Sequence, residues 1–315
     1  MMQETYVFVI PQFNDWEALN LLIDKINRDV KDEILANTSL LIIDDCSSRS
    51  RSVPYTAFKG KEIKQITLAR NLGHQRAIAI GLSYVDAELD CDKIVVLDAD
   101  GEDAPADINK LVARSLEQPE KVIFARRAKR QENLLFRVLY IVYKSLFKLL
   151  TGKIITFGNF SIIPRKRLFN LVRVSEIWNN YPVGVIRSRI PYDDIPTERA
   201  KRLAGESKMN LVSLILHGFS AISVMIDMTA VRILIFSIFL SVIAGIFICT
   251  IVFLKLIGNA TPGWASTLGV TLLMLIFQAF TISLFLVFMV LHSRTQQHFI
   301  PALQYKDFIA KIETI

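Results

Sequence analysis

Two long stretches without a charged residue, 233–254 and 264–291, constrain the fold more than any other feature of this sequence. Each exceeds the roughly 20 residues that an α-helix needs to cross a bilayer. Both are more apolar than an amphipathic helix, which keeps one polar face, so we favour membrane spans over buried core helices. The link between them contains Gly258, Pro262 and Gly263 and therefore predicts a tight helical hairpin.

The distribution of basic residues predicts how this hairpin is oriented. The link holds one base, Lys255, whereas the regions outside the spans are rich in Lys and Arg, and the chain has a net charge of +7. Cytoplasmic flanks carry the excess of basic residues, so we expect an integral membrane protein with two spans and both termini in the cytoplasm. No aromatic–basic module is present, so the charge favours anionic headgroups or a phosphorylated lipid as partner, and no nucleic acid.

Strand-like and helix-like segments alternate through the first part of the chain. Short apolar runs at 6–10, 39–43, 66–68 and 94–97 predict buried strands, and 16–30 has helical periodicity. Such alternation is typical of an α/β domain whose parallel strands are joined by crossover helices. A polar cluster follows each predicted strand, and open α/β sheets bind ligands at the carboxyl ends of their strands.

The fourth predicted strand is followed by Asp98, Asp100, Glu102 and Asp103, with Gly101 allowing a tight turn among them. Alternate carboxylates at the end of a buried strand are costly unless a cation or hydrogen bonds compensate them. Hard oxygen ligands suit Mg²⁺ or Mn²⁺, which usually share their coordination with substrate phosphates. A solvated acidic turn is the alternative, and the strand and the neighbouring motifs make it less favoured.

Several motifs occur in a characteristic order. They are Pro11-Gln12-Phe13-Asn14-Asp15, Ile43-Asp44-Asp45-Cys46-Ser47, Arg70-Asn71-Leu72-Gly73, Leu97-Asp98-Ala99-Asp100, Gly158-Asn159-Phe160-Ser161 and Arg202-Leu203-Ala204-Gly205-Glu206-Ser207-Lys208. In this order they resemble the membrane-anchored family 2 glycosyltransferases of the GT-A fold, in particular the polyprenyl-phosphate sugar transferases related to dolichol-phosphate mannose synthase. The resemblance covers about residues 6–225 and implies a Rossmann-like domain that binds a nucleotide sugar. The family typically has Gly where Cys46 stands, which affects the turn but removes no ligand.

The resemblance implies a site for a UDP- or GDP-type sugar donor. It assigns donor binding to Pro11, Phe13, Asp15, Asp44, Asp45, Arg70 and Gly73. Asp44 or Asp45 would accept hydrogen bonds from the base or ribose, although a turn or helix cap is an alternative use of Asp. Asp98 and Asp100 would be catalytic residues beside the diphosphate. Together with Glu102 they would hold Mg²⁺ or Mn²⁺, which neutralises charge on the leaving nucleoside diphosphate.

The resemblance also implies roles for basic residues. Arg126, after the predicted strand 121–125, matches a catalytic-site Arg near phosphate, and Arg137 matches an Arg that contacts acceptor phosphate. Arg137 shares one helical face of 134–150 with Lys144 and Lys148, for which snorkelling around an interfacial helix is the alternative. Arg202 and Lys208 resemble acceptor-phosphate positions too, and Arg suits phosphate geometry.

One departure from the family bears on the acceptor. Many relatives carry an Asp in the Gly-x-Phe block that serves as a base or lies near one, whereas this chain has Asn159. An amide cannot take the proton from a hydroxyl, but a lipid phosphate, with a second pKa near 6, is already largely dianionic at neutral pH. Asn159 therefore favours a phosphate nucleophile. His74 could be a base, but packing or hydrogen bonding near a helix start is the favoured interpretation.

We therefore expect a cytoplasmic GT-A domain at 1–208, an interfacial amphipathic helix at 209–230, two transmembrane helices at 231–292 and a cytoplasmic tail at 293–315. The predicted activity is metal-dependent, inverting sugar transfer from a nucleotide sugar to a polyprenyl phosphate. Transfer to a hydroxyl of a lipid or envelope glycan is one alternative, although the Gln-x-x-Arg-Trp motif of processive synthases is absent. A non-catalytic membrane scaffold is another, and the intact carboxylates argue against it. Assembly into a homo-oligomer stays open.

Overall fold

The computed structural model describes residues 4–51, 53–127, 134–205, 218–258, 263–295 and 299–315, without the side chains of 127, 134–141, 143 and 293–295. The chain divides into two compact units. The first comprises residues 1–137, 155–224 and 298–315, and the second comprises residues 138–154 and 225–297.

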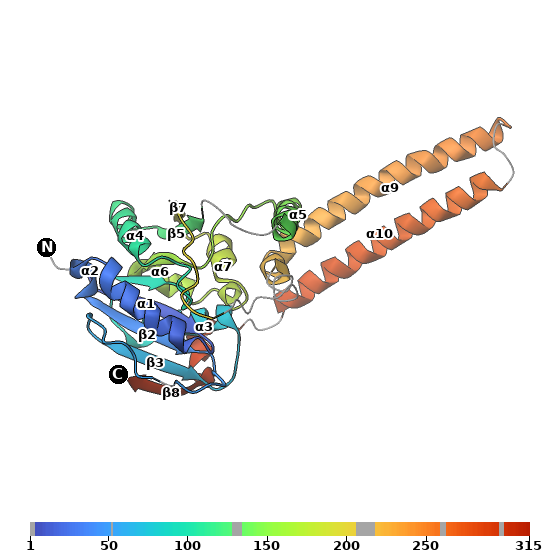
Figure 1. The fold of residues 1–315 in the computed structure, drawn as a ribbon. Helices are drawn as coiled ribbons and strands as arrows, with labels where there is room; N and C mark the ends of the chain where they lie inside the picture. The colour runs from blue at the N-terminus through green and yellow to red at the C-terminus, as the bar shows by residue number, and fades with distance from the viewer. Residues whose placement is uncertain (1–3, 52, 128–133, 206–217, 259–262, 296–298) are drawn as a thin grey trace. The chain divides into compact units, whose positions relative to one another are not determined.

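Within the described residues, eight strands form one sheet in the order β7-β5-β6-β4-β1-β2-β3-β8 (Figure 1). Their bounds are β1 Tyr6–Gln12, β2 Thr38–Asp44, β3 Ile63–Leu68, β4 Lys93–Val96, β5 Val122–Arg127, β6 Ser161–Pro164, β7 Tyr192–Thr197 and β8 Ile309–Thr314. The four strands β4, β1, β2 and β3 are parallel neighbours, as the alternating pattern predicts. The sheet as a whole is mixed, because β6 runs antiparallel to β4 and β5, and β8 runs antiparallel to β3.

Helices and 3₁₀ turns connect these strands. The helices are α1 Trp16–Asp29, α2 Asp32–Leu35, α3 His74–Glu88, α4 Ala106–Glu117, α5 Leu134–Thr151, α6 Arg165–Leu171, α7 Tyr181–Arg187, α9 Ile226–Leu256, α10 Trp264–Thr295 and α11 Pro301–Gln304. The 3₁₀ turns are η1 Ser175–Trp178 and η2 Tyr305–Phe308.

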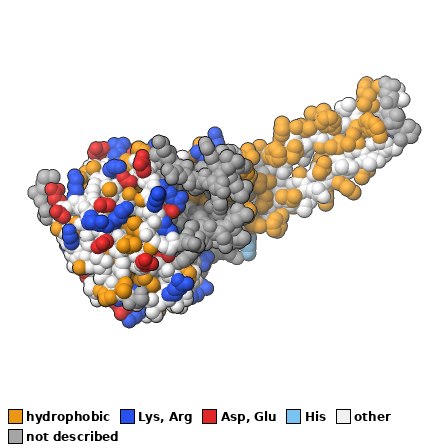
Figure 2. All heavy atoms as spheres, viewed as in Figure 1, with side chains coloured by type: hydrophobic (Ala, Val, Ile, Leu, Met, Phe, Trp, Pro, Cys, Tyr) orange, Lys and Arg blue, Asp and Glu red, His pale blue; other side chains and the backbone are white. Residues whose placement is uncertain are grey.

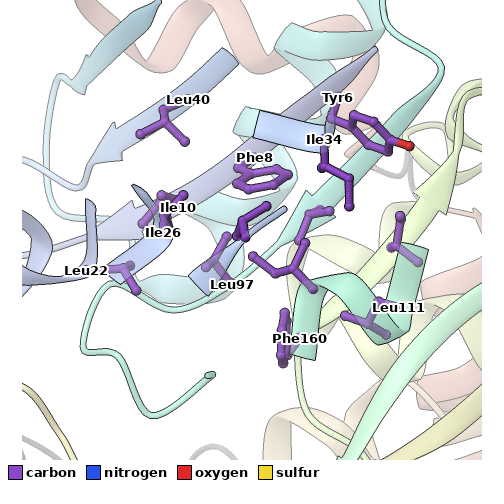
Figure 3. Close-up of a cluster of buried hydrophobic side chains, with 14 of the residues drawn as sticks. Tyr6, Phe8, Ile10, Leu22, Ile26, Ile34, Leu40, Leu97, Leu111 and Phe160 are labelled. Atoms are coloured by element: carbon purple, nitrogen blue, oxygen red, sulfur yellow. The ribbon is translucent and has the colours of Figure 1, made fainter. Parts of the chain in front are cut away.

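The core of the first unit lies against the central strand β1, whose side chains alternate between the two faces of the sheet. Phe8 and Ile10 point to one face, where Leu22 and Ile26 of α1 pack against them (Figure 3). Helix α3 covers the other face. Its Gly81 comes so close to the sheet that an added Cβ would lie 2.6 Å from Val9 Cγ1. Both faces of the sheet are therefore sealed, and ligands are left with its edges and strand ends.

Two helices of the second unit, α9 and α10, are long and apolar enough to cross a membrane. They enclose the predicted spans 233–254 and 264–291. Helix α9 extends its span at both ends, and α10 extends its span at the C-terminal end only. Their side chains form a largely hydrophobic surface (Figure 2), with residues such as Phe247 and Phe277 more than half exposed. Exposing such a surface to water costs free energy, whereas contact with the hydrocarbon of a bilayer does not.

After α10 the chain returns to the first unit. Strand β8 adds to the edge of β3, and Phe299 and Phe308 stack around Trp178 with ring centroids 4.1 and 5.2 Å away. The predicted tail, 293–315, thus ends as part of the α/β sheet. Of the interfacial helix predicted at 209–230, residues 209–217 lie outside the described residues, and α9 begins at Ile226.

Candidate active site

The acidic run predicted to carry the chemistry forms a tight turn beyond β4. Gly101 has a φ of 77°, a left-handed conformation that favours glycine, and an added Cβ would lie 2.3 Å from Leu203 Cδ1. Asp103 Oδ2 accepts a hydrogen bond from the N–H of Asp98 at 3.1 Å, and Asp100 Oδ1 accepts one from the N–H of Glu102 at 3.0 Å. These bonds fix the backbone of the turn.

The 199–205 segment packs on this turn and brings two Arg side chains to it. The N–H groups of Leu203 and Ala200 donate to the carbonyl oxygens of Asp100 and Glu102, at 2.9 and 3.0 Å. Arg202 lies between two carboxylates, with Nη1 3.0 Å from Asp100 Oδ2 and Nη2 2.9 Å from Asp15 Oδ1. Arg199 forms an ion pair with Glu102. The predicted acceptor residue Arg202 thus lies beside the predicted metal ligand Asp100.

His74, the first residue of α3, contacts the remaining carboxylate of the turn. Its Nε2 lies 3.0 Å from Asp98 Oδ1. Desolvation of the ring lowers the pKa of His74. The negative charges of Asp98, Asp103 and Asp100 outweigh this effect, so the pKa is raised overall. The sequence predicts a hydrogen-bonding role for His74 at the start of a helix. The structure agrees, with Asp98 of the acidic turn as the partner.

The donor set of this turn fits a hard divalent cation by its chemistry. Burial and the charge of Asp98 raise the pKa of Asp100, so a cation would relieve the cost of these adjacent carboxylates. Within the described ranges, no three His, Cys, Asp or Glu side chains are already arranged around a common metal position. In this structure Asp98, Asp100 and Glu102 each lie against a basic side chain. The metal site stays a prediction.

Asp44, the last residue of β2, and Asp45, which follows it, have different surroundings. Asp45 accepts hydrogen bonds on both oxygens, from the N–H of Leu72 at 2.7 Å and the N–H of Gly73 at 2.8 Å. Asp44 Oδ1 accepts bonds from Gln12 Nε2 at 2.6 Å and from the N–H of Ser47 at 3.1 Å. Burial raises the pKa of both carboxyls, although the hydrogen bonds act in the opposite direction. Asp45 therefore ties the Arg-Asn-x-Gly loop to the strand.

Cys46, where the family typically has Gly, lies in the turn that follows β2. Its φ is 57°, in the left-handed region where a Cβ is strained. The substitution thus places a side chain at a backbone conformation that favours glycine.

The other predicted donor residues lie around the same strand ends. Pro11 is buried within β1, Phe13 is half-buried beyond it, Gly73 precedes α3, and Arg70 is exposed. Arg126 Nε lies 2.6 Å from Asp194 Oδ1, so the structure pairs this predicted phosphate residue with β7. Arg137 belongs to α5 but its side chain lies outside the described residues, as does all of Lys208.

Sequence reasoning missed two participants in this region. Arg199 contacts Glu102, and Gln75 links Asn159 to α7 through a hydrogen bond of 3.0 Å from its Nε2 to Asn159 Oδ1. The position of Gln75 directly after His74, at the start of α3, could have indicated that Gln75 lies near the site. Its hydrogen-bond partners could not be identified in this way, because they are 84 and 106 residues away along the chain. Only the fold brings them together.

One family of known proteins matches this chain. The family described as "Glycosyl transferase family 2" matches residues 7–176, which include the donor motifs, the acidic turn and the Gly158–Ser161 block. The chain belongs to glycosyl transferase family 2, and the protein is a glycosyltransferase with a GT-A fold.

Two relatives illustrate the similarity. A Bacillus subtilis (strain 168) protein described as the uncharacterized glycosyltransferase YkoT is 26% identical over 84% of this chain and 80% of its own length. The undecaprenyl-phosphate 4-deoxy-4-formamido-L-arabinose transferase of Photorhabdus laumondii is 28% identical over 66% of this chain and 63% of its own length.

A solved structure supports the fold. The glucosyl-3-phosphoglycerate synthase of Mycobacterium tuberculosis, in complex with Mn²⁺, uridine-diphosphate and glucosyl-3-phosphoglycerate, aligns with a TM-score of 0.52 and 16% identity. The alignment covers 72% of this chain and 80% of that chain.

Proposed function

We propose that this glycosyltransferase uses Mg²⁺ or Mn²⁺ to transfer a sugar, with inversion, from a UDP- or GDP-type donor to a polyprenyl phosphate at the cytoplasmic membrane face. The observation that carries the proposal is the acidic turn after β4, where Asp100 and Glu102 lie beside Arg202 and Arg199 and where Asp98 lies beside His74. Similar proteins named for undecaprenyl phosphate support the acceptor class.

In this proposal Asp98, Asp100 and Glu102 hold the metal. A divalent cation there supplies neutralisation of the charge on the leaving nucleoside diphosphate. Metal binding requires Arg202 and Arg199 to leave their carboxylates, because a cation and a guanidinium compete for the same oxygens. In the absence of the donor, the ion pairs of Arg199 with Glu102 and of Arg202 with Asp100 neutralise the negative charge of the turn.

The donor lies along the ends of β1, β2 and β3. Asp44 faces the base or ribose, with Pro11, Phe13, Asp15 and Arg70 around the same pocket. Asp45 and Gly73 act by holding the loop that precedes α3, since both oxygens of Asp45 accept backbone N–H groups there.

The acceptor phosphate lies beside the acidic turn, at Arg202. Arg202, once it leaves Asp100, offers a planar pair of donors that matches a phosphate. Arg137 and Lys208 complete the acceptor site, and Arg126 adds positive charge after breaking its contact with Asp194. Two or more cations around a phosphate keep it ionised and orient it for in-line attack on the anomeric carbon.

The membrane placement follows from α9 and α10 as two spans. Strand β8 follows the second span and pairs with β3, and hydrogen-bonded strands of one sheet cannot lie on opposite sides of a bilayer. This pairing supports a hairpin that returns to its starting side. We assign 1–208 to the cytoplasmic domain, 209–230 to the interface, 231–292 to the spans and 293–315 to a cytoplasmic segment.

The test is to incubate membranes containing the full chain with polyprenyl phosphate and a panel of radiolabelled nucleotide sugars, and then to extract the lipids. One sugar should appear as an acid-labile lipid product, and excess chelator should abolish its formation. Asp100→Asn should lower the rate at least on the order of a hundredfold through lost electrostatic stabilisation. Asp90→Asn, at an exposed position that precedes β4, is the matched control and should retain the rate.

Two results would refute the proposal. Full activity in excess chelator would exclude the metal role. Equal transfer to a non-phosphorylated lipid would favour the hydroxyl acceptor, and Arg202→Ala should then leave acceptor use unchanged.

A further inference from the structure

A short series of hydrogen bonds leads from α7 into the candidate active site. The N–H of Tyr181, the first residue of α7, donates to Gln75 Oε1 at 2.7 Å. Gln75 Nε2 donates in turn to Asn159 Oδ1 at 3.0 Å. Asn159 Nδ2 lies 2.9 Å from His74 Nε2, which is itself 3.0 Å from Asp98 Oδ1. His74 Nε2 can make only one of these two bonds at a time, so the series reaches His74, which lies beside the acidic turn.

The backbone N–H of Tyr181 sets the direction of the whole series. The two ends of a side-chain amide have the same shape, so only their hydrogen-bond partners decide which way the amide points. A backbone N–H can only donate, so the oxygen of Gln75 must face Tyr181 and its NH₂ group must face Asn159. Asn159 accepts this hydrogen bond through its oxygen, and its own NH₂ group is therefore turned toward His74 and the acidic turn.

Asn159 thus presents hydrogen-bond donors at the place where the reaction is proposed to occur. Its amide carries two N–H groups, and His74 Nε2 can accept at most one of them, because a ring nitrogen has a single in-plane position. At least one N–H is left for a bound ligand, whichever way the His74 proton lies. Tyr181 is fully buried and α7 is capped by Asn180, so the start of the series is rigid.

We propose that Asn159 binds the acceptor phosphate through this N–H, and that Gln75 is the positioning residue that keeps the N–H pointed into the site. The inference rests on the proposed function and assigns these two residues to its acceptor. A phosphate oxygen brings its own negative charge and needs a donor. A carboxylate at the same position would repel it.

The transfer step needs no base under this assignment. The phosphate oxygen forms the new bond to the anomeric carbon, the bond from that carbon to the nucleoside diphosphate breaks, and the electron pair leaves with the diphosphate. No proton has to be removed from the nucleophile. A hydroxyl acceptor would need a group that takes up its proton, and the NH₂ group of Asn159 cannot do so. The Gln75–Asn159 pair therefore offers a hydrogen-bond donor to a phosphate but no base to a hydroxyl.

The test measures steady-state kinetics of the full-length protein with polyprenyl phosphate and with the active nucleotide sugar. Asn159→Asp replaces the donor by a negative charge of nearly the same shape. The KM for polyprenyl phosphate should rise about tenfold or more, as expected for loss of a hydrogen bond to a charged group, while the KM for the nucleotide sugar stays within about twofold. Gln304→Glu, which adds one negative charge at an exposed position of α11, should change neither value.

A second variant tests the positioning role and serves if Asn159→Asp does not fold. Gln75→Glu keeps an oxygen for the Tyr181 N–H but cannot donate to Asn159, whose amide is then free to turn its oxygen into the site. The KM for polyprenyl phosphate should rise about threefold, and in an Asn159→Ala background Gln75→Glu should have no further effect. A purely structural role would give additive losses.

The outcomes separate this inference from the proposed function. A wild-type enzyme that does not glycosylate polyprenyl phosphate refutes the proposed function, and this inference with it. An active wild type whose acceptor KM is unchanged by Asn159→Asp, or whose two KM values rise equally, refutes the inference alone. Additive effects of Gln75→Glu and Asn159→Ala refute the positioning role of Gln75.

Discussion

Replacing Asp45 by Asn should destabilise the protein far more than the same change at Asp44. Both oxygens of the buried Asp45 carboxylate accept backbone N–H groups, those of Leu72 and Gly73. An Asn keeps one oxygen and turns its NH₂ group toward the other N–H, so one charge-assisted hydrogen bond is lost. Such a bond contributes about 1.5–3 kcal/mol. The raised pKa of Asp45 indicates that burying its charge costs free energy. Asp45→Asn removes this charge, which offsets part of the loss.

We therefore expect Asp45→Asn to lower the free energy of unfolding by about 2 kcal/mol, or the thermal midpoint by about 4–8 °C for a domain of this size. At Asp44 the bonds from Gln12 and from the N–H of Ser47 both end on Oδ1, where an Asn can keep its carbonyl oxygen. Asp44→Asn should thus cost less than about 1 kcal/mol.

The assay is thermal denaturation of the purified protein in detergent, followed by circular dichroism, for the wild type and both variants. Nucleotide-sugar binding measured on the same samples separates a folding defect from a direct contact with the donor. Equal losses of stability in the two variants, or an unchanged midpoint in Asp45→Asn, would show that the bidentate contact does not hold the loop.

Three further predictions concern the turn, the pH dependence and the topology. Cys46→Gly should raise the free energy of unfolding by up to about 1 kcal/mol, because Gly adopts the left-handed φ of 57° without strain; a lower thermal midpoint would contradict this. Hydrogen bonds from Arg114 and Gln118 lower the pKa of Asp193 although burial opposes them, so its contribution to stability is present above the unfolded pKa near 4 and is lost as pH falls through the folded value. Asp193→Asn should therefore be less stable than wild type at pH 7, with the gap closing in acid, and thermal midpoints that stay equally separated at pH 3 would exclude this. Reporter fusions at residues 1 and 315 should both give cytoplasmic signals, and an extracytoplasmic C-terminus would refute the two-span hairpin.

The parts of the fold carried by local periodicity could be predicted from the sequence. The apolar runs of β1, β2, β3 and β4 repeat the pattern of buried parallel strands, and the bounds differ from the prediction by three residues at most. The uncharged stretches identify α9 and α10 because length and composition alone decide whether a helix can span a bilayer. The acidic turn could be placed because Asp98 and Asp100 follow a buried strand directly.

The direction and neighbours of the later strands could not be predicted in the same way. Strands β6 and β8 run antiparallel, and nothing in four or six residues of apolar pattern distinguishes the two directions. The segment that forms β8 lies some 240 residues from its partner β3, so only packing brings the two together. The aromatic cluster of Trp178, Phe299 and Phe308 likewise joins segments that α9 and α10 separate in the sequence.

The sequence by itself thus determined the chemical inventory of this protein: the carboxylates, the basic residues, the two long apolar helices and the family. Tertiary structure alone decided which groups meet. It placed Arg202 between Asp15 and Asp100, joined His74 to Asp98, and used the N–H of Tyr181 to orient Gln75 and Asn159. The physical reason is that a motif reports the chemistry of its own side chains, whereas hydrogen bonds and ion pairs depend on distances between residues far apart in the chain.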